Sequence, residues 1–222
     1  MVDTDKATLR RRFRAARRSL IPAQRRSHSA AIARHFASSP LALLRGTTAA
    51  YLANGWEVDP QPLVQRLHRR GQTVALPAVV GRASDQTLAF FETTAATPLQ
   101  PGTFGLLEPD PNARHVPAIR IRLLLMPLVA FDATGRRLGQ GGGFYDRFLA
   151  RFNRPSHPVA HLLPLGPLRI GLAFECQFSE QPLPSEAHDQ PLDGVLTECG
   201  FRVFSTRARR HGESSRQFAD NR

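Results

Sequence analysis

Apolar side chains near the start of the chain repeat with the period of an α-helix, at Leu9, Phe13, Ala16 and Leu20. This stripe predicts a helix that follows a Thr4 cap and ends near Leu20.

Three basic residues, Lys6, Arg10 and Arg17, lie at the border of this stripe rather than on the opposite face. The helical rotation of about 100° per residue therefore lets them reach the edge of a cleft while the helix packs. Pro22 ends the first helix and permits a second one over about residues 23–37.

The rest of the chain alternates between apolar strands and shorter helical segments. A helix is predicted within residues 57–71, where Gly71 ends it, and another begins in residues 145–152. Residues 98–117 and 154–167 are rich in proline and predict loops. Six segments have the length and composition of strands: residues 47–54, 73–80, 87–94, 119–132, 169–174 and 194–204.

Near-continuous apolar strands that alternate with helices predict an α/β fold, a three-layer α/β/α sandwich around a mainly parallel sheet. We expect a single catalytic domain over residues 1–204. The remaining residues 205–222 are basic and lack periodic apolar positions, so they are expected to form a disordered tail.

Charge adds a functional indication, since 30 basic and 18 acidic residues give a net charge of +12. Ten arginines and no carboxylate lie between Lys6 and Trp56. This asymmetry favours a polyanionic partner, either a nucleic acid or a phosphorylated or polycarboxylated small molecule. Compositional bias is the alternative, because Lys6 is the one lysine among the 30 basic residues.

Several classes of protein are not indicated by the sequence. No apolar run approaches the roughly 20 residues that cross a bilayer, and the first residues do not have the pattern of a secretory signal. Cys176 and Cys199 match no metal or redox spacing and are expected to be small core residues. We therefore expect a cytoplasmic protein with no membrane partner.

The segment "GRRLGQGGGFYDR", residues 135–147, is the main candidate for chemistry. A glycine turn between a buried strand and a helix can point backbone N–H groups at an anion. The sequence matches neither GxxxxGK[ST] nor GxGxxG, so a structural turn stays open as an alternative. Asp146 at its end suits Mg²⁺ beside a phosphate, or a simple ion pair with a neighbouring arginine.

The longer segment "MPLVAFDATGRRLGQGGGFYDRFLAR" resembles the central motif of the 5-formyltetrahydrofolate cyclo-ligase family. Other segments resemble that family in the same order, over roughly residues 6 to 200. They are "DKATLRRRFRAARRSL", "YLANGWEVDP", "TVALPAV", "GTFGLLEPDP" and "PLPSEAHDQPLDGVLTECG".

The resemblance implies an ATP- and Mg²⁺-dependent ligase. It would convert 5-formyltetrahydrofolate to 5,10-methenyltetrahydrofolate through a phosphorylated formyl group, and would release ADP and phosphate. Its partners would be these two small molecules, with Mg²⁺ as cofactor, and we expect a monomer. Asp146→Asn should then abolish turnover and change the melting temperature little.

The resemblance also implies roles for individual residues. The catalytic residues would be Lys6, Arg137 and Tyr145. ATP would be bound by Lys6, Arg10, Arg137, Leu138, Gly139, Gln140, Gly141, Gly142, Gly143, Phe144 and Tyr145. The folate would be bound by Leu52, Glu57, Gly141, Gly143 and Phe144. Mg²⁺ would be bound by Asp146 and Asp189, with Asp193 as the rival for the second position.

The sequence departs from the family pattern within the glycine segment. Phe144 replaces a first tyrosine, and Gln140 and Gly142 stand where some members have basic side chains. A relative with altered or lost folate activity is therefore one alternative, and capping of the next helix is an alternative role for Glu57. A nucleic-acid-binding protein is less favoured, because aromatic residues do not alternate with the basic ones.

Overall fold

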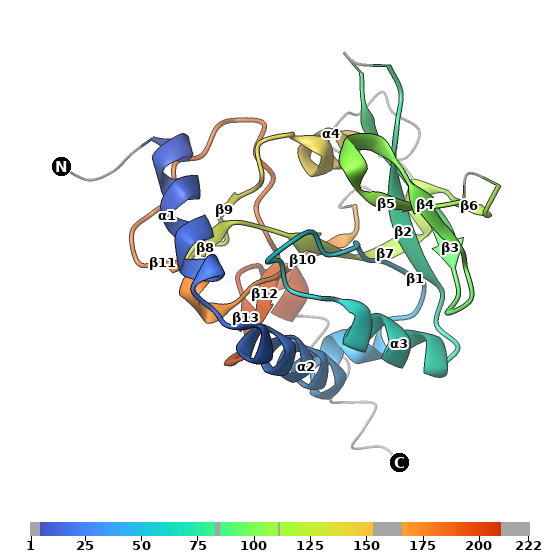
Figure 1. The fold of residues 1–222 in the computed structure, drawn as a ribbon, viewed down its shortest axis with the longest axis horizontal. Coiled ribbons are helices and arrows are strands. Elements are labelled where there is room, and N and C mark those ends of the chain that lie inside the picture. The colour runs from blue at the N-terminus through green and yellow to red at the C-terminus, as the bar shows by residue number, and fades with distance from the viewer. Residues whose placement is uncertain (1–4, 83–84, 111, 153–165, 210–222) are drawn as a thin grey trace.

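The computed structural model describes residues 5–82, 85–110, 112–152 and 166–209 of the chain. Its centre is an eight-stranded sheet in the order β13-β12-β10-β7-β1-β2-β3-β6 (Figure 1). Strands β12, β10, β7, β1 and β2 are parallel, and the other three pair antiparallel at the two edges. The strands are β1 (Thr47–Ala49), β2 (Val74–Val80), β3 (Thr87–Thr93), β6 (His115–Val116), β7 (Ile121–Pro127), β10 (Leu168–Leu172), β12 (Gly194–Thr197) and β13 (Gly200–Val203).

Helices cover both faces of this sheet, which confirms the predicted α/β architecture (Figure 1). Alternate side chains of β7 point to opposite faces: Leu123 and Leu125 pack with α2 and α3, whereas Leu124 and Met126 pack with α4. The helices are α1 (Lys6–Arg18), α2 (Pro22–Ser38), α3 (Gln61–Arg69) and α4 (Phe144–Ala150), with short 3-10 turns η1 (Pro40–Leu43), η2 (Thr103–Gly105), η3 (Ala118–Arg120) and η4 (Glu175–Gln177). No described helix is both long and apolar enough to cross a membrane.

Helix α1 packs outside the main layers, on a small second sheet of β8 (Ala130–Asp132), β9 (Arg137–Leu138) and β11 (Phe178–Ser179). Its N-cap is Asp5, whose carboxylate accepts a hydrogen bond from the backbone N–H of Thr8. The predicted cap, Thr4, lies outside the described residues. Leu9 and Phe13 are buried as predicted.

The predicted strand over residues 119–132 is divided into β7 and β8, contrary to the sequence prediction. The break lies at Leu128, whose carbonyl accepts hydrogen bonds from the side chains of Gln177, at 2.8 Å, and Arg17, at 3.3 Å. Side chains from distant segments thus satisfy a backbone group that a continuous strand would have paired. The break turns the chain from the main sheet toward α1.

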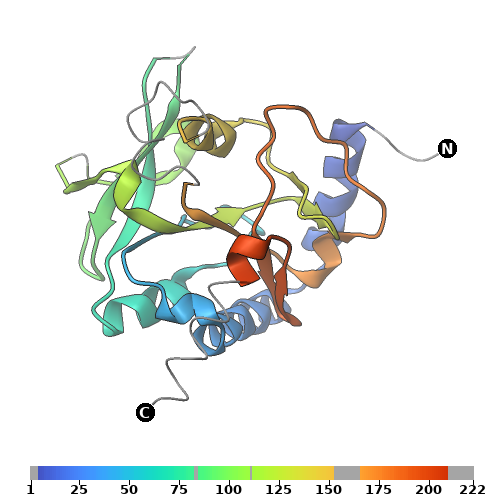
Figure 2. The same cartoon turned by 180° about the vertical axis from the view of Figure 1, so that it is seen from behind.

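Two other segments differ from the sequence prediction. The predicted loop 98–117 contains a hairpin, β4 (Leu99–Pro101) and β5 (Leu107–Pro109), as well as β6. The predicted last strand is a hairpin of β12 and β13 at one edge of the sheet (Figure 2). Cys199 lies in its turn and is exposed, so it is not a core residue, whereas Cys176 is partly buried.

The beginning of the predicted tail is ordered. Residues 206–209 form a helical turn, Ala208 is buried, and the Ser205 hydroxyl donates to Asp193 at 2.7 Å. The prediction of disorder was therefore wrong for residues 205–209. Residues 210–222 of the tail, and most of the predicted loop 154–167, lie outside the described residues.

Candidate active site

A cavity of about 600 Å³ opens at the carboxyl ends of the central strands. Pro127 ends β7 in its floor, Tyr51 follows β1, and Pro77 and Val79 come from β2. Ligands of open parallel sheets commonly bind at this edge. The predicted site residues that line the cavity are Lys6, Arg10, Leu52, Glu57, Arg137, Leu138, Gly139, Gln140, Gly141, Gly142, Gly143, Phe144, Tyr145, Asp146 and Asp189.

The glycine segment reaches the cavity from β9, a strand of the small sheet, rather than directly from the buried strand as predicted. Gly141 and Gly143 have φ angles of 110° and 64°, which disfavour other residues. The Arg10 Nε donates to the Gly139 carbonyl at 2.9 Å, so α1 fixes the start of the turn. The segment is therefore one wall of a cavity that other elements complete.

Lys6 reaches from α1 to two carboxylates at one end of the cavity. Its Nζ lies 2.7 Å from Asp189 and 2.8 Å from Glu186. Burial alone would lower the pKa of Lys6, but its hydrogen bonds to Asp189 and Glu186 outweigh this and raise the pKa. Burial likewise opposes a lower pKa for Asp189, and the Lys6 hydrogen bond outweighs it. Both groups are thus held in their charged forms at neutral pH.

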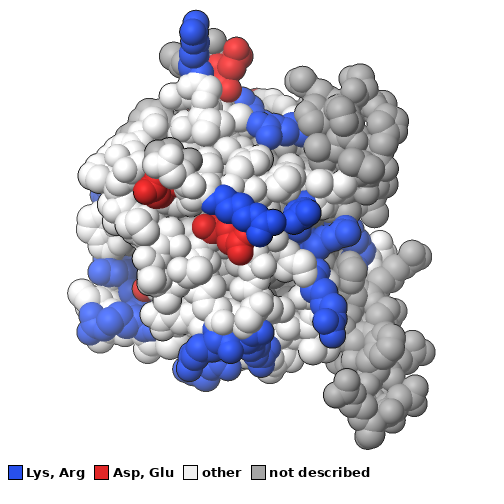
Figure 3. All heavy atoms as spheres, turned by 90° about the vertical axis from the view of Figure 1, so that its right-hand side faces the viewer, with Lys and Arg blue, Asp and Glu red and all other residues white. Residues whose placement is uncertain are grey.

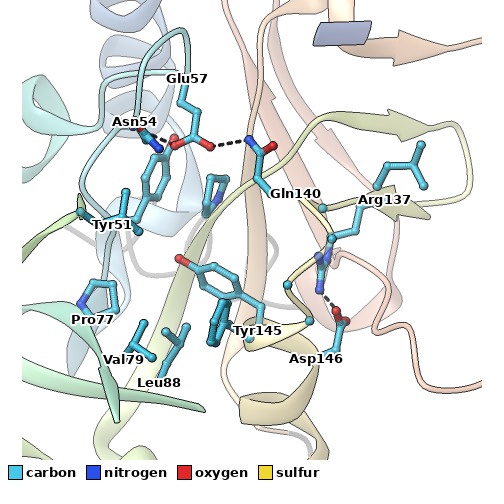
Figure 4. Close-up of a pocket in the computed structure, with 18 of the residues that line it drawn as sticks. Tyr51, Asn54, Glu57, Pro77, Val79, Leu88, Arg137, Gln140, Tyr145 and Asp146 are labelled. Carbon is cyan, nitrogen blue, oxygen red and sulfur yellow. Dashed lines mark hydrogen bonds and ion pairs between the residues drawn. The ribbon is translucent and has the colours of Figure 1, made fainter. Parts of the chain in front are cut away.

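A second ion pair lies beside the first, between Arg137 and Asp146 (Figure 4). Arg137 Nη2 is 2.6 Å from Asp146 Oδ1, which also accepts from the backbone N–H of Gln190 at 3.1 Å. Since Gln190 follows Asp189, the two predicted metal ligands approach one another. The Arg137 Nε is buried and has no hydrogen-bond acceptor among the described residues. This guanidinium therefore retains an unused donor for an anion.

The carboxylates at this end of the cavity, Asp146 and Asp189, are oxygen ligands of the kind that Mg²⁺ binds. Among the described residues, no group of three or more His, Cys, Asp or Glu side chains could hold a metal ion by itself. Mg²⁺ usually binds one or two protein carboxylates and completes its shell with water and phosphate oxygens. Asp146 and Asp189 fit that kind of site, in which the metal arrives with a phosphate group.

Glu57 closes the other end of the cavity and is only 9% exposed. Its Oε2 accepts from the backbone N–H of Asn54 at 3.0 Å, and its Oε1 accepts from Gln140 Nε2 at 2.8 Å (Figure 4). Helix α3 begins after Pro60 with no side-chain cap, so Glu57 does not cap that helix. Gln140, which the resemblance placed among the ATP ligands, contacts the predicted folate residue.

The orientation of the Gln140 amide is fixed by Arg14. The Arg14 Nη2 donates to Gln140 Oε1 at 2.8 Å, which turns the amide nitrogen toward Glu57. Arg14 also donates to the Gln140 backbone carbonyl, at 3.1 Å. One chain of hydrogen bonds therefore connects α1, the glycine segment and the Glu57 segment.

Apolar and aromatic side chains form the wall between the two polar ends. Tyr145 lies between Glu57 and the Arg137–Asp146 pair, and Pro77, Val79 and Leu88 face it (Figure 4). Burial, followed by the charge of Glu57, raises the pKa of the Tyr145 hydroxyl. Tyr145 is therefore a neutral hydrogen-bond donor over the physiological range of pH.

Asp193, the rival for the second metal position, does not line the cavity. It is 1% exposed, and its Oδ2 accepts from Arg169 Nε at 3.0 Å. Burial would raise the pKa of Asp193, but the hydrogen bonds from Arg169 outweigh it and lower the pKa. The pair therefore stabilises the fold above about pH 4, and its contribution is lost as the pH falls below that range.

Asp193→Asn is expected to lower the free energy of unfolding by about 1.5–3 kcal/mol, because it removes the charged hydrogen-bond acceptor of Arg169, a partly buried arginine whose side chain is 19% exposed. Urea denaturation at pH 7 measures this loss, and kcat at a temperature where the variant is folded should be unchanged. Asp189→Asn is the matched control. It should lower kcat and leave the free energy of unfolding almost unchanged. A collapse of kcat in Asp193→Asn, with Asp189→Asn active, would reverse the assignment.

Several residues that line the cavity or contact its wall were not found from the sequence. Glu186 and His188 stand within three positions of Asp189, in a segment that was noted only for its resemblance. Arg14 was one of ten arginines without carboxylate neighbours in sequence, and nothing local distinguishes it. Glu108 folds its own hairpin against β2, since its Oε1 accepts from Val79 N and Thr103 N, both at 3.2 Å.

Comparisons of the sequence with a family model and with curated relatives agree with one another. The model of the 5-formyltetrahydrofolate cyclo-ligase family matches residues 2–198. A 5-formyltetrahydrofolate cyclo-ligase of Escherichia coli K12 is 36% identical over 187 residues, which cover 83% of this chain and 96% of the relative. The corresponding protein of Haemophilus influenzae is 36% identical over 149 residues, 67% of this chain and 73% of the relative.

Solved structures agree with the fold. An Aquifex aeolicus 5,10-methenyltetrahydrofolate synthetase superposes with a TM-score of 0.72 at 28% identity, covering 90% of this chain and 92% of that one. A synthetase from Mycoplasma pneumoniae has the same fold, with a TM-score of 0.64 at 22% identity over 87% of this chain and 99% of that one. With the family model matched over most of its length, this chain belongs to the 5-formyltetrahydrofolate cyclo-ligase family of ligases.

Proposed function

We propose that the protein converts 5-formyltetrahydrofolate to 5,10-methenyltetrahydrofolate with ATP and Mg²⁺ as co-substrate and cofactor, and releases ADP and phosphate. One observation carries the proposal. The cavity joins a cationic and carboxylate end, around Lys6 and Asp146, to an apolar wall that leads to the buried Glu57. This arrangement suits a phosphate chain at one end and a flat ring with N–H donors at the other.

The reaction requires activation of the formyl oxygen, which is a poor leaving group. Transfer of the γ-phosphoryl group of ATP to that oxygen gives an iminium phosphate and ADP. The N10 amine then attacks the formyl carbon and loses its proton to solvent or to the departing phosphate, the C–O bond breaks, and phosphate departs with the oxygen. Positioning and charge neutralisation are the main requirements of such a transfer.

The cationic end of the cavity supplies the groups that phosphoryl transfer requires. Lys6 and Arg137 would neutralise phosphate oxygens, and the unused Nε of Arg137 is available as a donor. Asp146 and Asp189 would hold Mg²⁺, which when bound offsets the negative charge of the phosphates. The neutral Tyr145 hydroxyl would donate to the acceptor or to a transferred oxygen.

The Glu57 end would orient the folate. A carboxylate can accept several hydrogen bonds, so the ring amino and N–H groups can bind Glu57 while Asn54 continues to donate to it. Gln140 either keeps its contact with Glu57 or is displaced by the ring. Leu52 and Phe144 would contact the apolar parts of the substrate.

Purified protein with MgATP and 5-formyltetrahydrofolate is expected to generate the absorbance of 5,10-methenyltetrahydrofolate, with one ADP formed per product. Omission of ATP should abolish the signal. A protein that forms no methenyl product above the enzyme-free control does not have this activity. Hydrolysis of ATP in the presence of a different acceptor would then indicate a relative with altered specificity.

Glu57→Gln is expected to raise the KM for the folate about tenfold to a hundredfold and to leave the KM for ATP unchanged. The reason is that a hydrogen bond to a charged acceptor contributes about 1.5–3 kcal/mol. Steady-state kinetics with each substrate varied in turn measures both constants. Gln65→Glu, on the exposed side of α3, is a control that should change neither constant. An equal rise in both KM values would contradict the placement of the folate.

A further inference from the structure

A second concave surface lies at the opposite edge of the sheet from the candidate active site. It is an open groove of about 820 Å³ at the amino ends of β1, β2 and β7. Four basic residues line it, and all four are exposed: Arg45, Arg70, Arg120 and Arg122. We call this surface the arginine groove. Figure 3 shows basic side chains in groups on the face of the molecule that it presents, with acidic side chains beside some of them.

The charge of the arginine groove is not compensated by the fold. None of its four arginines forms an ion pair with any described residue. Among the residues that the structure describes, no aspartate or glutamate lines the groove. An arginine-rich composition explains why the chain has many arginines. It does not explain why four of them line one groove in which no described residue is a carboxylate. Like charges that line one groove without described acidic partners favour a bound anion.

The backbone is shaped to accommodate one of these side chains. Gly46 has a φ of 114°, and a Cβ at this position would lie 2.5 Å from Arg122 Cγ. The aliphatic stem of Arg122 therefore crosses the chain directly over Gly46. The groove volume lies within the range of pockets that bind small molecules, about 300–1,000 Å³.

The chemistry of the lining selects the kind of anion. Guanidinium groups bind phosphate oxygens with two parallel hydrogen bonds. None of the described residues that line the groove is phenylalanine, tyrosine or tryptophan, so these residues offer no aromatic surface on which a nucleic-acid base could stack. Four separate guanidinium groups suit several linked phosphates better than one. We propose that the arginine groove binds a linear chain of phosphate groups, recognised without bases, and that this site is distinct from the active site.

The proposal is tested by calorimetric titration of the full chain with linear inorganic polyphosphate, without ATP or Mg²⁺, at several salt concentrations. Binding should weaken steeply with salt, with a logarithmic slope of about −3 if four phosphates are neutralised. Arg45→Glu and Arg120→Glu should each weaken binding at least about tenfold and reduce the slope. Arg34→Glu, an exposed position on α2 outside the groove, changes the net charge equally and should weaken binding less than about threefold.

Three readings would overturn the proposal: no binding by the wild-type protein, equal loss in Arg34→Glu and Arg120→Glu, or tighter binding of a single-stranded oligonucleotide of equal charge. Methenyltetrahydrofolate formation should be the same in Arg45→Glu, Arg120→Glu and the wild type. This activity assay checks that the groove variants are folded. It also separates the groove from the active site, since failure of the proposed reaction would leave the titration unaffected.

Discussion

Asp146→Asn is expected to lower kcat/KM at least about a hundredfold at saturating Mg²⁺. Even residues that only support metal ligands typically change affinity or activity 10- to 100-fold. Asn keeps the acceptor for Arg137 Nη2 and for the Gln190 N–H, but it removes the charge that would hold the metal. Initial rates over a series of Mg²⁺ concentrations measure the effect. Wild-type activity at high Mg²⁺ would show that Asp146 is not a metal ligand.

The same variant should also be less stable, which the sequence did not predict. The side chain of Arg137 is 6% exposed, and Asp146 is its ion-pair partner. Loss of the carboxylate charge leaves a poorly compensated buried guanidinium, and we expect about 1–3 kcal/mol of destabilisation. Rates should therefore be compared at a temperature where the variant is fully folded. Asp193→Asn is the control, because it loses stability without loss of a cavity residue.

Lys6→Met is expected to lower kcat/KM by about 10²- to 10³-fold, the range found when one donor to a developing charge is removed. Its stability should change little, since the partner Glu186 is 57% exposed and such pairs contribute about 0–1 kcal/mol. The measurement is kcat and the KM for ATP, alongside a thermal melt. A variant with wild-type kinetics would exclude Lys6 from the reaction.

Lys6→Arg separates charge from shape. The lysine Nζ lies 2.7 Å from Asp189 and 2.8 Å from Glu186, a position suited to a compact ammonium. A guanidinium is broader and planar, so we expect about a tenfold loss of kcat/KM although the charge is kept. If Lys6→Arg matches the wild type, the single lysine of this chain has no special role.

The sequence predicted the fold well where local pattern and tertiary packing agree. The apolar stripe of α1 is buried at Leu9 and Phe13, and the parallel strands were found from their continuous apolar runs. It failed at Leu128, where Gln177 and Arg17 from distant segments interrupt the strand. Such a break depends on partners that no local window contains.

For the candidate site, the sequence indicated the separate segments but not the contacts between them. The position of Lys6 at the border of the stripe indicated that it could reach a cleft, and the glycines between a buried strand and a helix indicated residues 135–147. The Arg14–Gln140–Glu57 hydrogen bonds could not be predicted, because three segments must fold before their side chains meet. For the same reason the burial of Arg137 became evident only from the structure. So did the loss of stability expected when Asp146, its ion-pair partner, is replaced.

The proposed reaction depends on transfer of the γ-phosphoryl group of ATP to the formyl oxygen of the folate. It is tested most directly with 5-formyltetrahydrofolate that carries ¹⁸O in the formyl group, MgATP and the purified protein. Mass spectrometry of the released inorganic phosphate gives the answer. We expect one ¹⁸O atom in each phosphate that is formed together with product. Phosphate that contains only ¹⁶O, with methenyltetrahydrofolate still formed, would contradict it.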